Sequence, residues 1–162
     1  MKKLTILIGT FFLLVGLALE AVEPREALAD FKDSAKKGNF EAVWKKMLKI
    51  PNISPEGEVT YREKVNKDMA RFKEGADFVI IDHKIDGDCA VVLVNEIKES
   101  NGKGANYDPI YLLKQDGEWK FFPNFSIYRQ AIQIAPDKVE TFKRLQVWYD
   151  KQEEIAKSRP QL

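Results

Sequence analysis

The sequence contains very few of the residues that build metal and redox sites: its 162 residues include one Cys and one His. A structural zinc site and an internal disulfide both need more, so both are excluded. An excess of charge of one sign is also missing, because 26 Lys and Arg side chains are balanced by 25 Asp and Glu. Without a basic surface, no binding of nucleic acid is expected. We therefore predict no metal, no cofactor and no nucleic acid partner.

The short motifs that identify many enzymes are missing as well. The sequence has no phosphate-binding loop, nucleophile elbow, paired cysteines or zinc-binding helix of the protease type. A partial calcium-loop pattern at Asp82 and Asp86 fails, because Lys84 occupies its third position and Leu93 its twelfth. No residue is therefore predicted to be catalytic.

A signal peptide is predicted at the N-terminus, over residues 1–21. Lys2 and Lys3 precede an apolar run at residues 4–19, which ends at Glu20. A helix of this length spans about 24 Å, less than the roughly 30 Å of the hydrocarbon core of a membrane. A cleaved secretory signal is therefore favoured over an uncleaved N-terminal anchor. We expect a bacterial protein that is exported, periplasmic or secreted, and that touches a membrane only if this segment stays uncleaved.

The residues around the end of the apolar run leave the cleavage position open. Gly16 and Ala18 provide small residues at −3 and −1, while cleavage after Ala21 fits this preference less well. Ala27 and Ala29 fit it too but lie far from the apolar run.

Export also bears on the single cysteine, which in an oxidising compartment is either buried or paired between chains. An apolar sequence follows Cys89, and burial is predicted.

Residues 22–135 are predicted to form one α+β domain that begins with helices. The first helix follows Pro24 and ends at Gly38, and Asn39 caps a second helix that ends at Pro51. The apolar stripe of the first helix is Leu28, Phe31 and Ala35, and that of the second is Phe40, Val43, Trp44, Met47 and Leu48.

A third helix is predicted after a loop at residues 51–57. The sequence Thr60-Tyr61-Arg62-Glu63 matches a capping box, in which the Thr hydroxyl and the Glu carboxylate each accept a backbone N–H at the start of a helix. Gly75 ends the helix, and its apolar stripe is Tyr61, Val65, Met69 and Phe72.

Four strands are predicted next, in two hairpins. The turns are Asp86-Gly87 and Asp116-Gly117, because these dipeptides favour two-residue turns with positive φ. The strands are residues 77–85, 88–97, 107–115 and 118–122. In the second hairpin the turn pairs Leu112 with Phe121 and Lys114 with Trp119.

The turn of the first hairpin predicts its pairs and faces in the same way. The expected pairs are Ile85 with Asp88, His83 with Ala90, Ile81 with Val92, and Val79 with Val94. Phe78 and Ile80 would then lie on the opposite face, with Cys89, Val91 and Leu93. A sheet this apolar must be covered, and the three helices can cover it.

The C-terminal part, residues 136–162, is predicted to be a helix and a tail. The preceding residues 126–134 are ambiguous between a strand and a short helix. The helix presents an apolar stripe of Val139, Phe142, Leu145, Trp148 or Tyr149, and Ile155. Two interpretations stay open: this stripe packs on its own domain, or it forms a surface for a partner or a homodimer.

Four side chains are candidates for lining a ligand pocket: His83, Trp44, Tyr111 and Trp119. The imidazole titrates near neutrality, and on an apolar strand face it could contact a ligand or act as a general base. The alternative is a structural histidine with one hydrogen-bond partner. For the three aromatic residues the alternative is a place in the core.

Two stretches resemble the nuclear transport factor 2-like superfamily. Residues 31–44, FKDSAKKGNFEAVW, are similar to its opening pair of helices, and residues 112–121, LLKQDGEWKF, are similar to its late hairpin. The resemblance implies an α+β fold in which three N-terminal helices pack on a curved, mainly antiparallel, cone-like sheet around a pocket. The superfamily includes isomerases, dehydratases and non-catalytic proteins, so a shared fold does not determine the function.

The function expected from the sequence is non-catalytic binding of a small apolar ligand or a protein partner. This expectation implies an enclosed cavity of several hundred Å³. Two alternatives are kept: an enzyme of the isomerase or dehydratase type that uses His83, and an interaction module that acts through the C-terminal helix.

Overall fold

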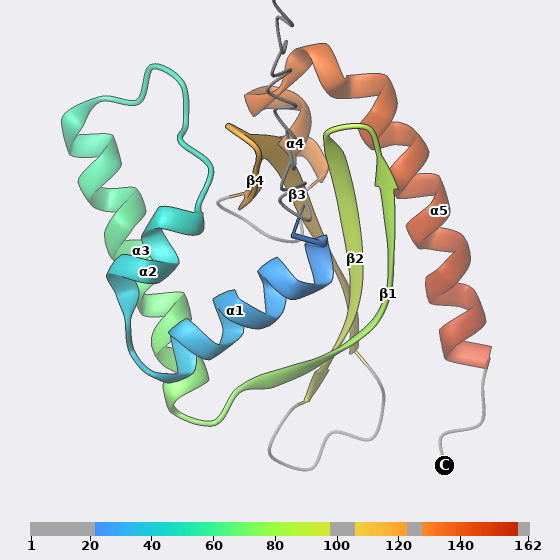
Figure 1. The fold of residues 1–162 in the computed structure, drawn as a ribbon, viewed down its shortest axis with the longest axis horizontal. Helices are drawn as coiled ribbons and strands as arrows, with labels where there is room; N and C mark the ends of the chain where they lie inside the picture. Colours follow the sequence, from blue (N-terminus) through green and yellow to red (C-terminus); the bar gives the residue numbers. More distant parts are fainter. Residues whose placement is uncertain (1–21, 98–105, 123–127, 159–162) are drawn as a thin grey trace, which may run out of the picture.

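The computed structural model describes residues 22–97, 106–122 and 128–158 (Figure 1). The predicted signal peptide, most of the loop after residue 97 and the C-terminal tail after residue 158 lie outside the described residues. None of the helices in the described ranges has both the length and the apolar composition needed to cross a membrane.

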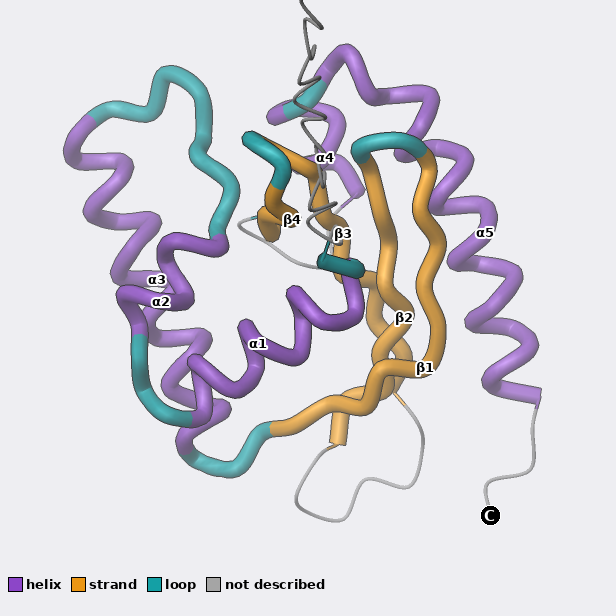
Figure 2. The backbone as a smooth tube through the Cα atoms, in the orientation of Figure 1, coloured by secondary structure: helices purple, strands orange, loops and turns teal. Residues whose placement is uncertain are grey.

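An antiparallel sheet forms the middle layer, with helices on both faces (Figure 1, Figure 2). Its strands lie in chain order: β1 (Asp77–Asp86), β2 (Cys89–Ile97), β3 (Asn106–Gln115) and β4 (Glu118–Phe121). One face packs on α1 (Pro24–Lys36), α2 (Phe40–Lys46) and α3 (Pro55–Lys73), the other on α4 (Tyr128–Ile134) and α5 (Val139–Ser158). The α+β class, the antiparallel sheet and the C-terminal helix are confirmed.

The first two helices start and stop largely where the sequence predicts. Gly38 has a φ of +66°, which suits glycine after a helix end, and the Asn39 side chain accepts a hydrogen bond from the Ala42 N–H (3.2 Å). The predicted end of the second helix at Pro51 is wrong, because α2 stops at Lys46.

The chain leaves α2 early because it pairs with the sheet. Met47 forms a parallel bridge with Phe121, and the Leu48 N–H donates to the Phe121 carbonyl oxygen (2.7 Å). Extended residues point alternately to opposite sides. Met47 is therefore buried in the core beneath α1–α3, and Leu48 in the core beneath α4 and α5.

The third helix begins earlier than the capping box predicts. Ser54 is its N-cap, with the side-chain oxygen accepting from the Gly57 N–H (3.1 Å), and Pro55 is its first residue. Proline suits this position because the first N–H of a helix has no partner within it. The predicted cap at Thr60 is wrong: its hydroxyl lies inside the helix and donates to the Glu56 carbonyl oxygen (3.0 Å).

The second hairpin has the predicted turn and register. Asp116 and Gly117 have φ values of +53° and +83°, as a two-residue turn of this kind requires. The observed pairs include Leu112 with Phe121 and Lys114 with Trp119.

The first hairpin is shifted from the predicted register. Its turn residues are Gly87 and Asp88, and Ile85 pairs with Ala90 while His83 pairs with Val92. These two expected pairs are therefore wrong by two positions, a shift that leaves Ile85 and His83 on their predicted face. The pair of Val79 is wrong by one position, because Val79 pairs with Asn95 beyond the irregularity of β1. Asp88 contributes to the shift, since its carbonyl oxygen accepts the Lys114 N–H of β3 (2.7 Å).

An irregularity in β1 between Ile80 and Asp82 reverses the sides of the sheet to which the first residues of the strand, 77–80, point. Ile80 pairs with Val94 there, so Phe78 and Ile80 pack in the core beneath α1–α3. Val79 becomes 48% exposed. The predicted faces of these residues are wrong, because one extra residue in a strand reverses every side chain beyond it.

The face beneath α5 forms a second apolar core. Phe142, Leu145 and Tyr149 of α5 pack there with Cys89 and Tyr111 of the sheet. Cys89 is fully buried, as predicted, and burial raises the pKa of its thiol to about 11. The ambiguous segment before α5 is helical at Tyr128–Ile134. Phe142, Leu145 and Tyr149 of the predicted apolar stripe pack on the sheet of their own domain, whereas Ile155 is 37% exposed.

Replacing Leu145 with alanine tests this packing. Leu145 is 1% exposed in the core beneath α5, so L145A should lower the free energy of unfolding by about 2–5 kcal/mol. Val147 lies on the same helix and is 69% exposed, so V147A should change it by less than about 0.5 kcal/mol. Urea unfolding followed by circular dichroism measures both, and equal effects would contradict the packing of α5 on the sheet.

Candidate functional site

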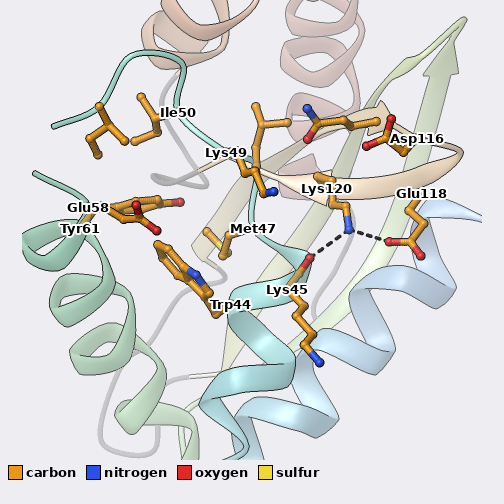
Figure 3. Close-up of a pocket in the computed structure, with 13 residues that line it drawn as sticks. Trp44, Lys45, Met47, Lys49, Ile50, Glu58, Tyr61, Asp116, Glu118 and Lys120 are labelled. Carbon is orange, nitrogen blue, oxygen red and sulfur yellow. Dashed lines mark hydrogen bonds and ion pairs between the residues drawn. The ribbon is translucent and has the colours of Figure 1, made fainter. Parts of the chain in front are cut away.

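A pocket of about 690 Å³ lies between the helical layer and the tip of the second hairpin (Figure 3). Its apolar lining comes from α2, α3 and the segment between them: Trp44, Met47, Leu48, Ile50, Ile53 and Tyr61. Its polar lining comes from both sides: Lys45, Lys49, Glu58, Gln115, Asp116, Glu118 and Lys120. The side formed by α2, α3 and the segment between them is therefore aromatic and aliphatic with charged residues among them, and the side formed by the hairpin is polar.

Two aromatic rings form the helical wall of the pocket. Trp44 on α2 and Tyr61 on α3 have ring centroids 5.0 Å apart with an interplanar angle of 58°. The guanidinium carbon of Arg62 lies 5.3 Å from the centroid of the Trp44 ring, and Arg62 also pairs with Glu41. This wall offers flat apolar surface, and one face of the indole already has a cation beside it.

The Tyr61 hydroxyl is buried and has no hydrogen-bond partner among the described residues. Burial raises the pKa of this phenol, so the hydroxyl stays neutral and keeps its proton at physiological pH. A buried donor without an acceptor destabilises the folded chain by about 1–3 kcal/mol. An acceptor brought to this hydroxyl by a ligand would remove that cost.

An ion pair organises the wall formed by the second hairpin. The Lys120 ammonium donates to the Glu118 carboxylate (2.5 Å) and to the carbonyl oxygen of Lys45 (2.9 Å) near the end of α2 (Figure 3). Lys120 thereby ties β4 to α2 and holds the pKa of Glu118 below its usual range. Lys49 also lines the pocket, and its ammonium has neither an ion pair nor a hydrogen bond within the described ranges.

Of the four predicted pocket residues, Trp44 lines this pocket. Trp119 is 7% exposed and lies in the core beneath α1–α3. Tyr111 is fully buried on the other face of the sheet, where its hydroxyl donates to the Gln146 side chain. The described pocket does not include His83, and so does not bring these four residues together.

His83 lies on β1 beside the start of α1. Its Nε2 is 3.7 Å from the Glu23 carboxylate, and its Nδ1 is buried without a partner among the residues that the structure describes. The Asp82 carboxylate accepts the backbone N–H of His83 (2.8 Å). The described residues contain no group of three or more His, Cys, Asp or Glu placed to hold a metal ion.

Tyr61, Lys49 and Lys120 line the pocket although the sequence pattern does not predict them there. Tyr61 has the helical spacing of a core residue, and that spacing does not show that its hydroxyl would lack a partner. Lys49 and Lys120 look like ordinary surface lysines until the Met47 bridge brings their segments together. The bond from Lys120 to the Lys45 carbonyl oxygen had no signal in the sequence, because that carbonyl lies near a helix end only once α2 stops at Lys46.

No family model and no curated protein matches the chain. Two solved structures are similar to it, each at 19% identity over 62% of this chain. One is a Campylobacter jejuni protein named as a candidate NTF2-like transpeptidase, with a TM-score of 0.49 and 98% of its own chain covered. The other is an NTF2-like protein of unknown function from Cytophaga hutchinsonii, with a TM-score of 0.41 and 88% covered. Both carry the name of the superfamily that the sequence resembles.

Substitution of Tyr61 by phenylalanine tests whether its hydroxyl lacks a partner. Y61F removes a buried donor that makes no bond, so the free energy of unfolding should stay unchanged or rise by up to about 1 kcal/mol. The matched control is Y149F, because the Tyr149 hydroxyl donates to the Tyr107 carbonyl oxygen (2.9 Å). Y149F should lower the free energy by about 0.5–1.5 kcal/mol. A similar loss in Y61F would mean that its hydroxyl is bonded.

Proposed function

We propose that this protein binds a small amphipathic molecule, without chemical change, in the pocket between Trp44 and Lys120. The observation that carries the proposal is the two-sided lining, with the Trp44 and Tyr61 rings on one side and the Lys120–Glu118 ion pair on the other. The volume of about 690 Å³ lies within the roughly 300–1,000 Å³ typical of ligand pockets. The sequence predicted an apolar ligand, and the polar groups of the pocket lining favour a ligand that also has a polar end.

Binding without catalysis fits the state of the polar groups in the pocket. The Glu118 carboxylate is engaged by Lys120, which lowers its pKa and makes it a poor base. The Tyr61 phenol keeps its proton, because burial raises its pKa. The alternative of an enzyme based on His83 has less support, since the His83–Glu23 pair is not part of the pocket lining.

The alternative of an interaction module acting through α5 also has less support. Three side chains of its predicted stripe, Phe142, Leu145 and Tyr149, are buried against the sheet, whereas Ile155 near the end of the helix is 37% exposed. A partner that used these side chains would have to displace α5 from its own domain.

Loss of dye binding in a Trp44 variant tests the proposed pocket. N-phenyl-1-naphthylamine, a neutral amphipathic dye, should bind with one site, and W44L should weaken binding by about tenfold or more, since Trp44 supplies the flat wall. W148L is the control, because Trp148 lies on α5 outside the pocket. Fluorescence titration gives both constants. Equal effects of W44L and W148L would contradict the pocket.

We also propose that the chain is exported after removal of its N-terminal segment. The apolar run at residues 4–19 supports this, and α1 limits where the chain can be cut. Cleavage after Ala27 or Ala29 would remove buried α1 residues and the Glu23 partner of His83.

The intact mass of the protein from its own host tests this proposal. We expect a product that starts at or before Glu23 and is found outside the cytoplasm, because such a product keeps α1 whole. A full-length cytoplasmic product would contradict export. A product that starts after Ala27 would contradict the expectation that the mature protein keeps α1 whole. Native mass spectrometry of the same sample would show whether a small molecule or a protein copurifies.

A further inference from the structure

Two hydrogen-bond donors of the pocket have no acceptor among the residues that the structure describes. One is the Tyr61 hydroxyl, which is buried on α3 beside Trp44. The other is the Lys49 ammonium, on the segment that leads from the Met47 bridge to α3. Figure 3 shows Tyr61 and Lys49 as parts of the same pocket lining. An ammonium has donors and no acceptor, and a neutral phenol can donate one hydrogen bond.

The lining of the pocket carries three lysines and three carboxylates, so the position of Arg62 at the aromatic wall is what disfavours a cationic ligand there. A cationic ligand stacked on Trp44 would lie close to the Arg62 guanidinium, whose carbon is 5.3 Å from the ring centroid. Of the pocket carboxylates, Glu118 is already neutralised by Lys120. Lys45, Lys49, Glu58 and Asp116 also line the pocket, and all four are exposed, so solvent weakens the interaction of each with a charged ligand.

We infer that the ligand of this pocket is a small hydrophobic anion, whose acceptor-only oxygen group pairs with Lys49 and accepts a hydrogen bond from Tyr61. Its apolar body then lies against the Trp44 ring. This inference rests on the proposed function and specifies the ligand class of the same pocket. The hydroxyl is shielded from solvent, so this hydrogen bond requires a side chain of the pocket wall to shift when the ligand binds.

A pair of dyes that differ in one anionic group tests the ligand class. The probes are 1-anilinonaphthalene-8-sulfonate and its neutral counterpart N-phenyl-1-naphthylamine. The sulfonate should bind about tenfold more tightly, as expected for charge-assisted hydrogen bonds that replace unpaired donors. K49Q and Y61F should each weaken binding of the sulfonate by several-fold, and by more than they weaken binding of the neutral dye. Y61F is suited to this test because the hydroxyl it removes makes no bond within the described fold.

The control K151Q removes the same charge from an exposed position of α5 that is not part of the pocket. It should leave both dyes unchanged. If both dyes bind equally well and W44L weakens the binding of both, the proposed pocket is supported and the anionic ligand class is wrong. If neither dye depends on Trp44, the proposed function itself is wrong. If K151Q weakened the binding of the sulfonate dye as much as K49Q does, the effect would come from the overall charge of the protein, and this result would also overturn the inference.

Discussion

The pairing of Met47 and Leu48 with the end of β4 is the constraint on which the candidate site depends. The backbone cannot continue α2 and bond to Phe121 at the same residues, so the helix stops at Lys46. The bridge holds the following segment beside the second hairpin, and the pocket lies between them (Figure 3). Met47 and Leu48 also insert into opposite cores, which ties this local pairing to both layers of helices.

Burial of both faces explains why the central strand of the sheet is almost entirely apolar. β2 lies between β1 and β3, and its residues from Cys89 to Val94 are all buried, because helices cover each side. An apolar run of this kind does not show which residue faces which layer. In β1 the irregularity at Ile81 determines which side chains point to which helical layer. It also interrupts the regular edge that the strand would offer to another chain.

The two walls of the pocket come from distant parts of the chain. Trp44 and Tyr61 belong to the helical layer, whereas Glu118 and Lys120 belong to the hairpin. Lys120 bonds to the Lys45 carbonyl oxygen and joins these parts without a ligand. A ligand that contacts both walls would add a second connection and so stabilise the folded chain against unfolding.

Local chemistry in the sequence determined the helix boundary at Gly38 and Asn39, the Asp116-Gly117 turn with its register, and the burial of Cys89. The first two depend on one or two residues and their immediate neighbours, and the burial of Cys89 follows from the apolar run that contains it. Tertiary structure decided the early end of α2, the shifted first hairpin and the pocket. Each of these depends on a backbone group that bonds to a distant strand, as Leu48 does to Phe121 and Asp88 to Lys114. The sequence pattern shows that such groups need partners, but only the folded chain selects them.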